Sequence, residues 1–535
     1  MPRWLPLLLL VGSLGTSPLF AQTPPILQHP ASVEPKLLSE LNSPFRETNL
    51  TISPDGKQLF FMSGRGGQAW STKGGYRFQG REEWDGDIWQ SEKLHRQWQA
   101  PQPLGRGVNS SQGEDEPSIS PDGSQVYFQS WRGGWESNGG PYYRAQLTGN
   151  TWGQTRGLGG GINRFFRSKQ FATDGMAVAP DGSFFMVAAG PDYDGNLNLF
   201  LSRKGKNGTW SYPKALNVNT RHDERSVFIA GDSRTIYFAS SGYGGEGGLD
   251  LFKAELQTDG SLSNLLNLGP PFNTPQDDYG LIITANGEEA FFVRDGDLYQ
   301  VDLRLADPRI RPGATILIGG TVQTESGQAL GAAIELREAT SGKVIFRTRS
   351  NTRTGTFAMA LPYRPGPLAL RAGKQGFSPT EAILPAEQIS RNPEIQQTLV
   401  LGKAAQTGSR GQPSPTPPDP PDLDEPFVFQ FDHNSARVLP KYADILQGLA
   451  ELQRKYPNIQ LALSGHTDAD GAETYNLSLS KRRVMAVARC LMKEGAIEEQ
   501  LFWDFCGENK PISSNEIEAG KAKNRRVEIR IIRSE

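Results

Sequence analysis

An acidic and a basic side chain near the end of the chain are spaced so that one small ligand could touch both. Asp468 follows an apolar segment, residues 459–464, that predicts a strand, and Arg483 lies on a helix predicted over residues 475–494. A strand end and the following helix can face one groove. A carboxylate there would hold an ammonium group, and the guanidinium fork would hold a carboxylate through two hydrogen bonds. The alternative is an internal Asp–Arg ion pair with a structural role.

Three more polar residues complete the predicted binding set. Asn476 shares a helical face with Arg483, because steps of three or four residues return to the same side of a helix. Asn476 and Thr467 would orient the groove, and Asp432 could add a second acceptor.

The elements that must position these residues form an α+β arrangement in the order β-α-β-α-β-β. The apolar patterns predict strands and helices in about 110 residues. The strands cover residues 427–432, 459–464, 501–506 and 526–532, and the helices cover residues 440–453 and 475–494.

Residues 426–535 resemble the OmpA-like peptidoglycan-binding domain over nearly their whole length. The matching motifs are Gly-His-Thr-Asp-x-x-Gly at 465–471, Asn-x-x-Leu-Ser-x-x-Arg at 476–483 and Asn-Arg-Arg-Val-Glu at 524–528. The resemblance implies binding of the diaminopimelate in the wall peptide, with Asp468 and Arg483 as principal partners. Diaminopimelate presents an ammonium and a carboxylate on one carbon, which suits this acid and base.

Cysteine and histidine give little support for metal chemistry. The two cysteines, Cys490 and Cys506, could form a disulfide in an oxidising compartment, or could be two separately buried thiols. The five histidines are scattered and neither CxxC nor HExxH occurs, so we expect no metal site and no cofactor.

A repeat organises the first half of the chain. Turns of the Pro-Asp-Gly type recur around residues 54, 121, 180, 231 and 285, each preceded by a strand-like segment and followed by two more, and a fourth strand is predicted at residues 98–104 and 210–216. Four antiparallel strands per unit, repeated around an axis, predict an all-β propeller over residues 22–308. The repeats resemble the PD40 (TolB-like) family.

The phase of the repeat predicts how the ring closes. Residues 41–47 resemble residues 108–114, which end a unit, yet they precede the first turn. We therefore expect residues near 36–48 to supply the final strand of the last blade. This implies five blades, with a sixth possible.

Two further segments precede the C-terminal domain. Residues 313–401 alternate as short half-buried strands and resemble the carboxypeptidase regulatory-like domain, a small all-β sandwich. Residues 402–425 are rich in proline, which predicts a semi-rigid extended linker.

The start of the chain and its charge indicate export. Residues 1–21 combine a basic start, a short apolar run and a small final residue, as in a secretory signal. The mature protein should contain no transmembrane segment. A net charge of −2 argues against nucleic acid as a partner.

The multidomain architecture predicts a non-catalytic protein of a Gram-negative periplasm, bound to peptidoglycan at or near the outer membrane. An unknown envelope protein or glycan would bind the propeller, and an envelope or secretion assembly is one setting in which the protein could act. The domain order resembles the peptidoglycan-binding component of the type IX secretion system. The alternatives are a wall-tethered hydrolase or lyase and a ligand sensor. The GxGxxG sequence at 242–247 precedes strand-like residues, so it predicts no dinucleotide site.

Overall fold

The computed structural model describes residues 23–65, 74–78, 80–84, 86–148, 150–191, 195–205, 208–391, 394–403, 426–456, 459–497 and 500–533. The predicted signal and nearly all of the predicted linker lie outside these residues. The chain divides into two compact units, Met1–Ala405 and Gln406–Glu535, which are described separately.

The first unit is rich in antiparallel β-sheet, and five of its sheets follow the sequence repeat. The first sheet has the order β2-β3-β6-β7, with β8 also paired to β6; the second is β9-β10-β11-β12, the third β13-β14-β15-β16, the fourth β17-β18-β19-β20 and the fifth β21-β22-β23-β1. Their bounds are β1 (Lys36–Leu37), β2 (Glu47–Ile52), β3 (Gln58–Ser63), β6 (Asp87–Leu94), β7 (Gln97–Trp98), β8 (Gln102–Pro103), β9 (Glu114–Ile119), β10 (Gln125–Ser130), β11 (Tyr142–Thr148), β12 (Thr151–Gly157), β13 (Ala172–Val178), β14 (Phe184–Gly190), β15 (Asn198–Arg203), β16 (Lys214–Ala215), β17 (Glu224–Ile229), β18 (Thr235–Ser240), β19 (Asp250–Leu256), β20 (Leu262–Asn267), β21 (Asp278–Ile283), β22 (Glu289–Arg294) and β23 (Asp297–Asp302).

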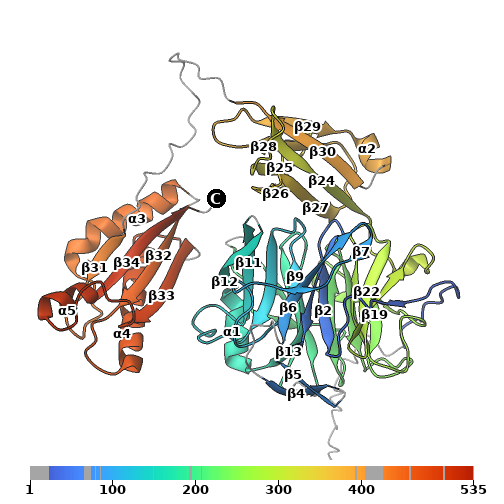
Figure 1. The fold of residues 1–535 in the computed structure, drawn as a ribbon, viewed down its shortest axis with the longest axis horizontal. Coiled ribbons are helices and arrows are strands. Elements are labelled where there is room, and N and C mark those ends of the chain that lie inside the picture. Colours follow the sequence, from blue (N-terminus) through green and yellow to red (C-terminus); the bar gives the residue numbers. More distant parts are fainter. Residues whose placement is uncertain are drawn as a thin grey trace, which may run out of the picture. The chain divides into compact units, whose positions relative to one another are not determined.

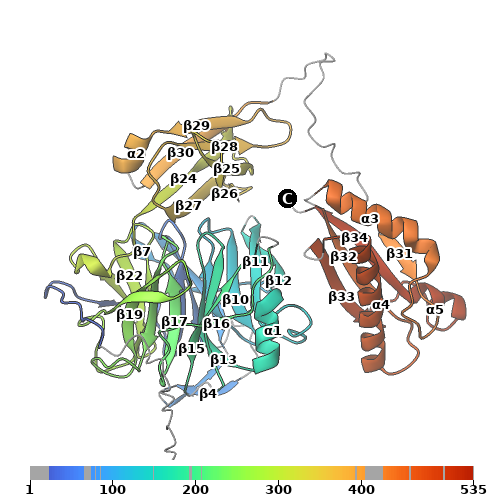
Figure 2. The same ribbon diagram turned by 180° about the vertical axis from the view of Figure 1, so that it is seen from behind.

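These five sheets pack on one another in cyclic order (Figures 1 and 2). The first strand of each sheet contacts the first strand of the next, in the order β2, β9, β13, β17 and β21, and β21 contacts β2. Apolar side chains fill the spaces between neighbouring sheets; Leu59 and Phe61 of the first sheet share a cluster with Phe291 and Val293 of the fifth.

The early segment β1 pairs with the last of the five sheets. Lys36 is opposite Gln300 and Leu37 is opposite Tyr299 in an antiparallel register. The Asn42 side chain then accepts from the Leu298 N–H (2.7 Å) and donates to the Leu298 carbonyl (3.1 Å). Residues from the predicted 36–48 segment thus form the outer strand of the fifth sheet.

The repeated turns owe their form to glycine and to short polar side chains. Gly56, Gly123, Gly182 and Gly287 have φ between 67° and 71°, a left-handed conformation that glycine adopts without a Cβ clash. In the first turn the Ser53 hydroxyl donates to Asp55 and accepts from the Gln58 N–H. Such bonds fix each turn locally.

A buried acid begins the first strand of four of the five sheets. The acids are Glu47, Glu114, Glu224 and Asp278, and each accepts hydrogen bonds from the serine or threonine four residues earlier. An arginine completes three of these clusters: Arg65 with Glu47, Arg132 with Glu114 and Arg294 with Asp278. The repeated polar motif therefore hydrogen-bonds each loop to the strand that follows it.

Among the five repeated sheets, one helix and one hairpin were not predicted. Helix α1 (Gly160–Lys169) lies between the second and third sheets and buries Phe165 and Phe166. A hairpin, β4 (Gly74–Phe78) with β5 (Arg81–Trp84), lies between β3 and β6 in the chain.

The described residues of the segment 313–401 form two sheets that enclose one apolar cluster. One sheet has the order β27-β24-β30 and the other β26-β25-β28-β29. The bounds are β24 (Thr315–Thr324), β25 (Ala333–Glu338), β26 (Val344–Arg349), β27 (Thr356–Pro362), β28 (Leu368–Gly373), β29 (Thr380–Leu384), α2 (Ala386–Arg391) and β30 (Glu394–Leu401).

This pair of sheets contacts the repeated turns. The Ala360 N–H donates to the Pro121 carbonyl (2.9 Å), and the Thr348 hydroxyl donates to Asp122 (2.7 Å). The Gly313 N–H donates to Asp232 in the turn of the fourth sheet (2.7 Å). The turns thus form part of a surface on which residues 313–401 rest.

The second unit is a mixed sheet with helices. The sheet has the order β31-β34-β32-β33, in which only β32 and β33 run parallel. The bounds are β31 (Phe427–Gln430), α3 (Ala443–Lys455), β32 (Ile459–His466), α4 (Glu473–Lys493), β33 (Leu501–Gly507), α5 (Glu518–Asn524) and β34 (Arg526–Arg533). The predicted elements lie within a few residues of these bounds. The predicted order lacked α5, a short helix before the last strand. Within the described residues, no helix is both long and apolar enough to cross a membrane.

Candidate functional site

The carboxylate of Asp468 is buried beyond the end of β32, and its partner is an arginine that the site prediction did not include. Oδ2 accepts from Arg525 Nη1 at 2.8 Å, and His433 Nδ1 lies 3.7 Å from the same oxygen. Only 3% of Asp468 is exposed, so a charge there needs a close cationic partner. In this structure Arg525 supplies it.

Arg483 is fully buried on α4, and its guanidinium donates hydrogen bonds to backbone carbonyls. Nε donates to the carbonyl of Ser435 (2.8 Å), Nη1 to that of His466 (2.9 Å) and Nη2 to that of Asp432 (3.2 Å). The guanidinium thereby joins the loop after β31 to the end of β32. The Asp468–Arg483 ion pair weighed as the structural alternative is not formed; Arg483 is bonded to carbonyls instead.

Burial is the main influence on the charge of Arg483. Desolvation lowers its pKa to about 10, and the nearby Asp468 carboxylate acts in the opposite direction. The side chain stays protonated at neutral pH. It therefore places a positive charge close to Asp468 without touching it.

Two polar side chains of the predicted set are buried with an unused atom. Thr467 Oγ1 and Asn476 Oδ1 have no hydrogen-bond partner among the described residues. The Asn476 amide donates to Glu508, and the Thr467 N–H donates to the Gly507 carbonyl (2.8 Å). Buried polar atoms without partners are uncommon, and each costs free energy unless a ligand or water satisfies it.

Asp432 lies at the edge of this group. Its side chain is exposed, and its backbone carbonyl makes the contact with Arg483. The structure thus brings Thr467, Asp468 and Arg483 together, with Asp432 beside them through its backbone.

Two outer pairs surround the buried acid. Arg525 Nη2 donates to Glu518 (2.7 Å), and Lys521 pairs with Asp470 (2.7 Å). The Lys521 contact lowers the pKa of Asp470. Because helix α5 carries Glu518 and Lys521, the element missing from the prediction supplies two residues at the rim.

A metal ion has one set of candidate ligands in the described part of the chain: His433, Asp468 and Asp470, whose ligand atoms lie within 4.8 Å of one another. Arg525 and Lys521 already occupy the two carboxylates. A metal ion would have to overcome repulsion from both cations.

The possible disulfide is not formed. No disulfide joins Cys490, which is half-buried on α4, to Cys506, which is buried on β33. Cys490 packs against the apolar core of the second unit, so it behaves as a small apolar side chain.

The sequence prediction left Arg525 and His433 out of the binding set. Arg525 lies in the Asn-Arg-Arg-Val-Glu motif at 524–528, which was one of the matching motifs, so the motif contained the signal. His433 is next to Asp432, and nothing in its spacing marks it.

The second unit matches a known protein family. The model of the OmpA family matches residues 430–525. The C-terminal part of this chain is therefore an OmpA-like domain.

Curated relatives match the same part of the chain. The probable lipoprotein YiaD of Escherichia coli (strain K12) is 36% identical over 107 residues, which are 20% of this chain and 49% of YiaD. The peptidoglycan-associated lipoprotein of Legionella pneumophila is 31% identical over 101 residues, 19% of this chain and 57% of the relative. The peptidoglycan-binding protein ArfA of Mycobacterium tuberculosis (strain ATCC 25618 / H37Rv) is 34% identical over 99 residues, 18% of this chain and 30% of ArfA. The match spans about half or less of the length of most of these relatives.

Among solved structures, the peptidoglycan-associated lipoprotein from Burkholderia pseudomallei is similar to this chain with 31% sequence identity and a TM-score of 0.19. The similarity covers 20% of this chain and 89% of that one.

Proposed function

We propose that the OmpA-like domain binds peptidoglycan through diaminopimelate, and that the first unit is a non-catalytic scaffold held at the wall of a Gram-negative periplasm. The observation that carries the proposal is a buried carboxylate, Asp468, next to a buried hydroxyl of Thr467 that has no hydrogen-bond partner in the described part of the chain. Both lie within the residues that match the OmpA family.

Asp468 would receive the ammonium group of the ligand. Its carboxylate already accepts a charged N–H from Arg525, and an ionised carboxylate has about four acceptor sites. An ammonium can therefore bind beside Arg525 rather than replace it. The unused Thr467 hydroxyl gives the same ammonium a second acceptor.

Arg483 would receive the ligand carboxylate. A guanidinium has five N–H bonds, and three are used by backbone carbonyls. One N–H remains on each terminal nitrogen, which is the pair a carboxylate accepts from. Because Arg483 is fully buried, this contact requires residues 433–435 to move outward when the ligand enters.

The names of two relatives support the ligand class. ArfA is called a peptidoglycan-binding protein, and the Legionella protein is called a peptidoglycan-associated lipoprotein. The shared region is the domain that contains the site.

The first unit would hold a second partner. We interpret its five cyclically packed sheets as a five-bladed propeller, with residues 313–401 as a regulatory-like sandwich resting on the turns. An envelope protein or glycan is the expected partner of this scaffold.

The test is co-sedimentation of the full chain with purified peptidoglycan that contains diaminopimelate. Asp468→Ala should weaken binding about 10- to 150-fold, since loss of one partner of a charged hydrogen bond costs about 1.5–3 kcal/mol. Arg483→Ala should weaken binding and also destabilise the domain, because three backbone carbonyls lose their donor. Circular dichroism is needed to separate these two effects.

Asp444→Ala is the matched control, because Asp444 is an exposed acid on α3 of the same domain. It should sediment like the wild type. Folded Asp468→Ala protein that sediments equally well would reduce the Asp468–Arg525 pair to a structural role and contradict the proposal.

A further inference from the structure

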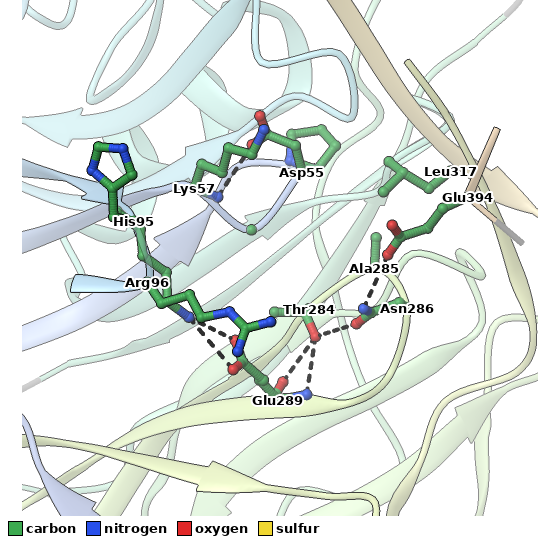
Figure 3. Close-up of a pocket in the computed structure, with 13 residues that line it drawn as sticks. Asp55, Lys57, His95, Arg96, Thr284, Ala285, Asn286, Glu289, Leu317 and Glu394 are labelled. Atoms are coloured by element: carbon green, nitrogen blue, oxygen red, sulfur yellow. Dashed lines mark hydrogen bonds and ion pairs between the residues drawn. The ribbon is translucent and has the colours of Figure 1, made fainter. Parts of the chain in front are cut away.

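A pocket lies inside the first unit, where two repeated turns meet residues 313–401 (Figure 3). Its volume is about 290 Å³. The walls come from the turns of the first and fifth sheets, the β6–β7 hairpin, and strands β24 and β30. The cavity is near the lower limit of the sizes usual for small-molecule sites.

The acids of this pocket already have partners within the protein. Glu289 accepts from Lys93 (3.1 Å) and from Gln300 (3.0 Å). Oε1 of Glu394 accepts from the Asn286 amide (3.2 Å), which leaves its other oxygen for a ligand.

Two cations of the pocket lack such partners. The side chains of Lys57 and Arg96 make no hydrogen bond or ion pair with the described residues. Figure 3 shows the Arg96 guanidinium reaching into the pocket from the hairpin, with Glu394 entering from the other side. The unpaired cations of Lys57 and Arg96 and the unused carboxylate oxygen of Glu394 therefore face the same pocket.

The hairpin that carries Arg96 has an unfavourable backbone. His95 and Arg96 have φ of 49° and 68°, where turns of this kind usually have asparagine or glycine. A left-handed residue with a Cβ costs about 1–2 kcal/mol. Strain of this kind is often found where a side chain has to be presented to a ligand.

We propose that this pocket binds a small zwitterion, a free amino acid or a short peptide. Arg96 and Lys57 would hold its carboxylate, and the free oxygen of Glu394 would hold its ammonium group. A simple anion would face the nearby carboxylates of Glu394 and Glu289, and a simple cation would face Arg96. A ligand with both charges matches both parts of the wall.

The experiment is isothermal titration calorimetry on the full chain with alanine, alanyl-alanine and trialanine, which distinguish a free amino acid from a peptide. The ligand that binds with the highest affinity is then compared with its N-acetylated form and its C-terminal amide. Each capped form should bind at least about 10-fold more weakly, because it lacks one charged partner.

Two variants assign the charges to residues. In Arg96→Asn, which retains a residue that tolerates left-handed φ, the difference in affinity between the acid and the amide should shrink, because only Lys57 is left to hold the carboxylate, while the N-acetyl form still binds more weakly. In Glu394→Gln the pattern should reverse. Lys343→Ala, which removes an exposed cation elsewhere in residues 313–401, should change nothing.

Absence of binding by all three ligands at millimolar concentration, or equal binding by the capped forms, would overturn the proposal. So would unchanged discrimination in Arg96→Asn. Peptidoglycan sedimentation of the same variants should stay at the wild-type level, because the wall site lies in the other unit. Failure of one proposal is therefore distinguishable from failure of the other.

Discussion

At the scale of single residues, the repeated acid of the first unit has different partners from sheet to sheet. Glu114 is paired with Arg132, whereas the Glu224 carboxylate accepts from Thr220 and Ser240 and has no ion-pair partner within the described residues. Burial raises the pKa of Glu224 to about 7, and the hydrogen bonds from Thr220 and Ser240 oppose that rise only in part. Glu224 is thus a buried acid that folding prefers in its protonated form.

This difference predicts that the first unit loses stability between pH 5 and pH 8. The folded state holds a proton on Glu224 up to about pH 7, while the unfolded chain releases it near 4.5, so stability falls as pH rises through this window. A shift of this size corresponds to at most about 3 kcal/mol. Thermal unfolding of Glu224→Gln across the same range should show a smaller loss.

Glu114→Gln is the contrast, because it leaves Arg132 without its ion-pair partner. This variant should lower the melting temperature at pH 5 and at pH 8 alike. A Glu224→Gln protein with the same pH dependence as the wild type would assign the effect to other buried acids, such as Glu116, whose pKa burial raises to about 8.

At the scale of elements, the repeated turns serve two purposes. Each turn joins two strands of its own sheet, and the turns of the second and fourth sheets also bond to residues 313–401. Gly123 has φ of 67° in the second of these turns, and no atom crowds its Cβ position more closely than 3.9 Å. Its conformation, rather than lack of space, explains why glycine is there.

Gly123→Ala should therefore destabilise the first unit by about 1–2 kcal/mol, which is the cost of a left-handed residue with a Cβ. Gly105→Ala is a matched control, because Gly105 has open space and an ordinary φ. Urea denaturation of both variants measures the difference. Equal midpoints for the two would show that the turn relaxes without cost.

The sequence predicted the helices and strands better than it predicted which side chains contact one another. The Pro-Asp-Gly spacing located the strands around each turn because the signal is local. Helix α1 was missed because its apolar residues, among them Phe165 and Phe166, extend over only ten positions beside glycine. The pairing of Asp468 with Arg525 depends on residues 57 positions apart, which no local pattern reports. Likewise, spacing placed Arg483 near Asp468 but could not show that backbone carbonyls use three of its donors.

At the scale of the whole molecule, the chain consists of two units with separate apolar cores. The OmpA-like domain has its own cluster around Leu461, Val484 and Ile529, and residues of the first unit take no part in it. Each unit should therefore be stable without the other.

Expression of residues 22–405 and 406–535 as separate proteins tests this. Each fragment should unfold cooperatively, and the two transitions should add up to the calorimetric profile of the full chain. A fragment that is unfolded by circular dichroism, or a transition shifted by more than a few degrees, would show that the units depend on each other.

The pairing of β1 with β23 has a consequence for the order of events in folding. Lys36 meets Gln300 only after about 260 intervening residues have been made, so β1 gains its partner strand late. Until then the outer edge of the fifth sheet is open to other strands, including those of a second copy of the chain. A ribosome or a translocation channel that paused before residue 300 would hold a chain in which β1 had not yet paired with β23.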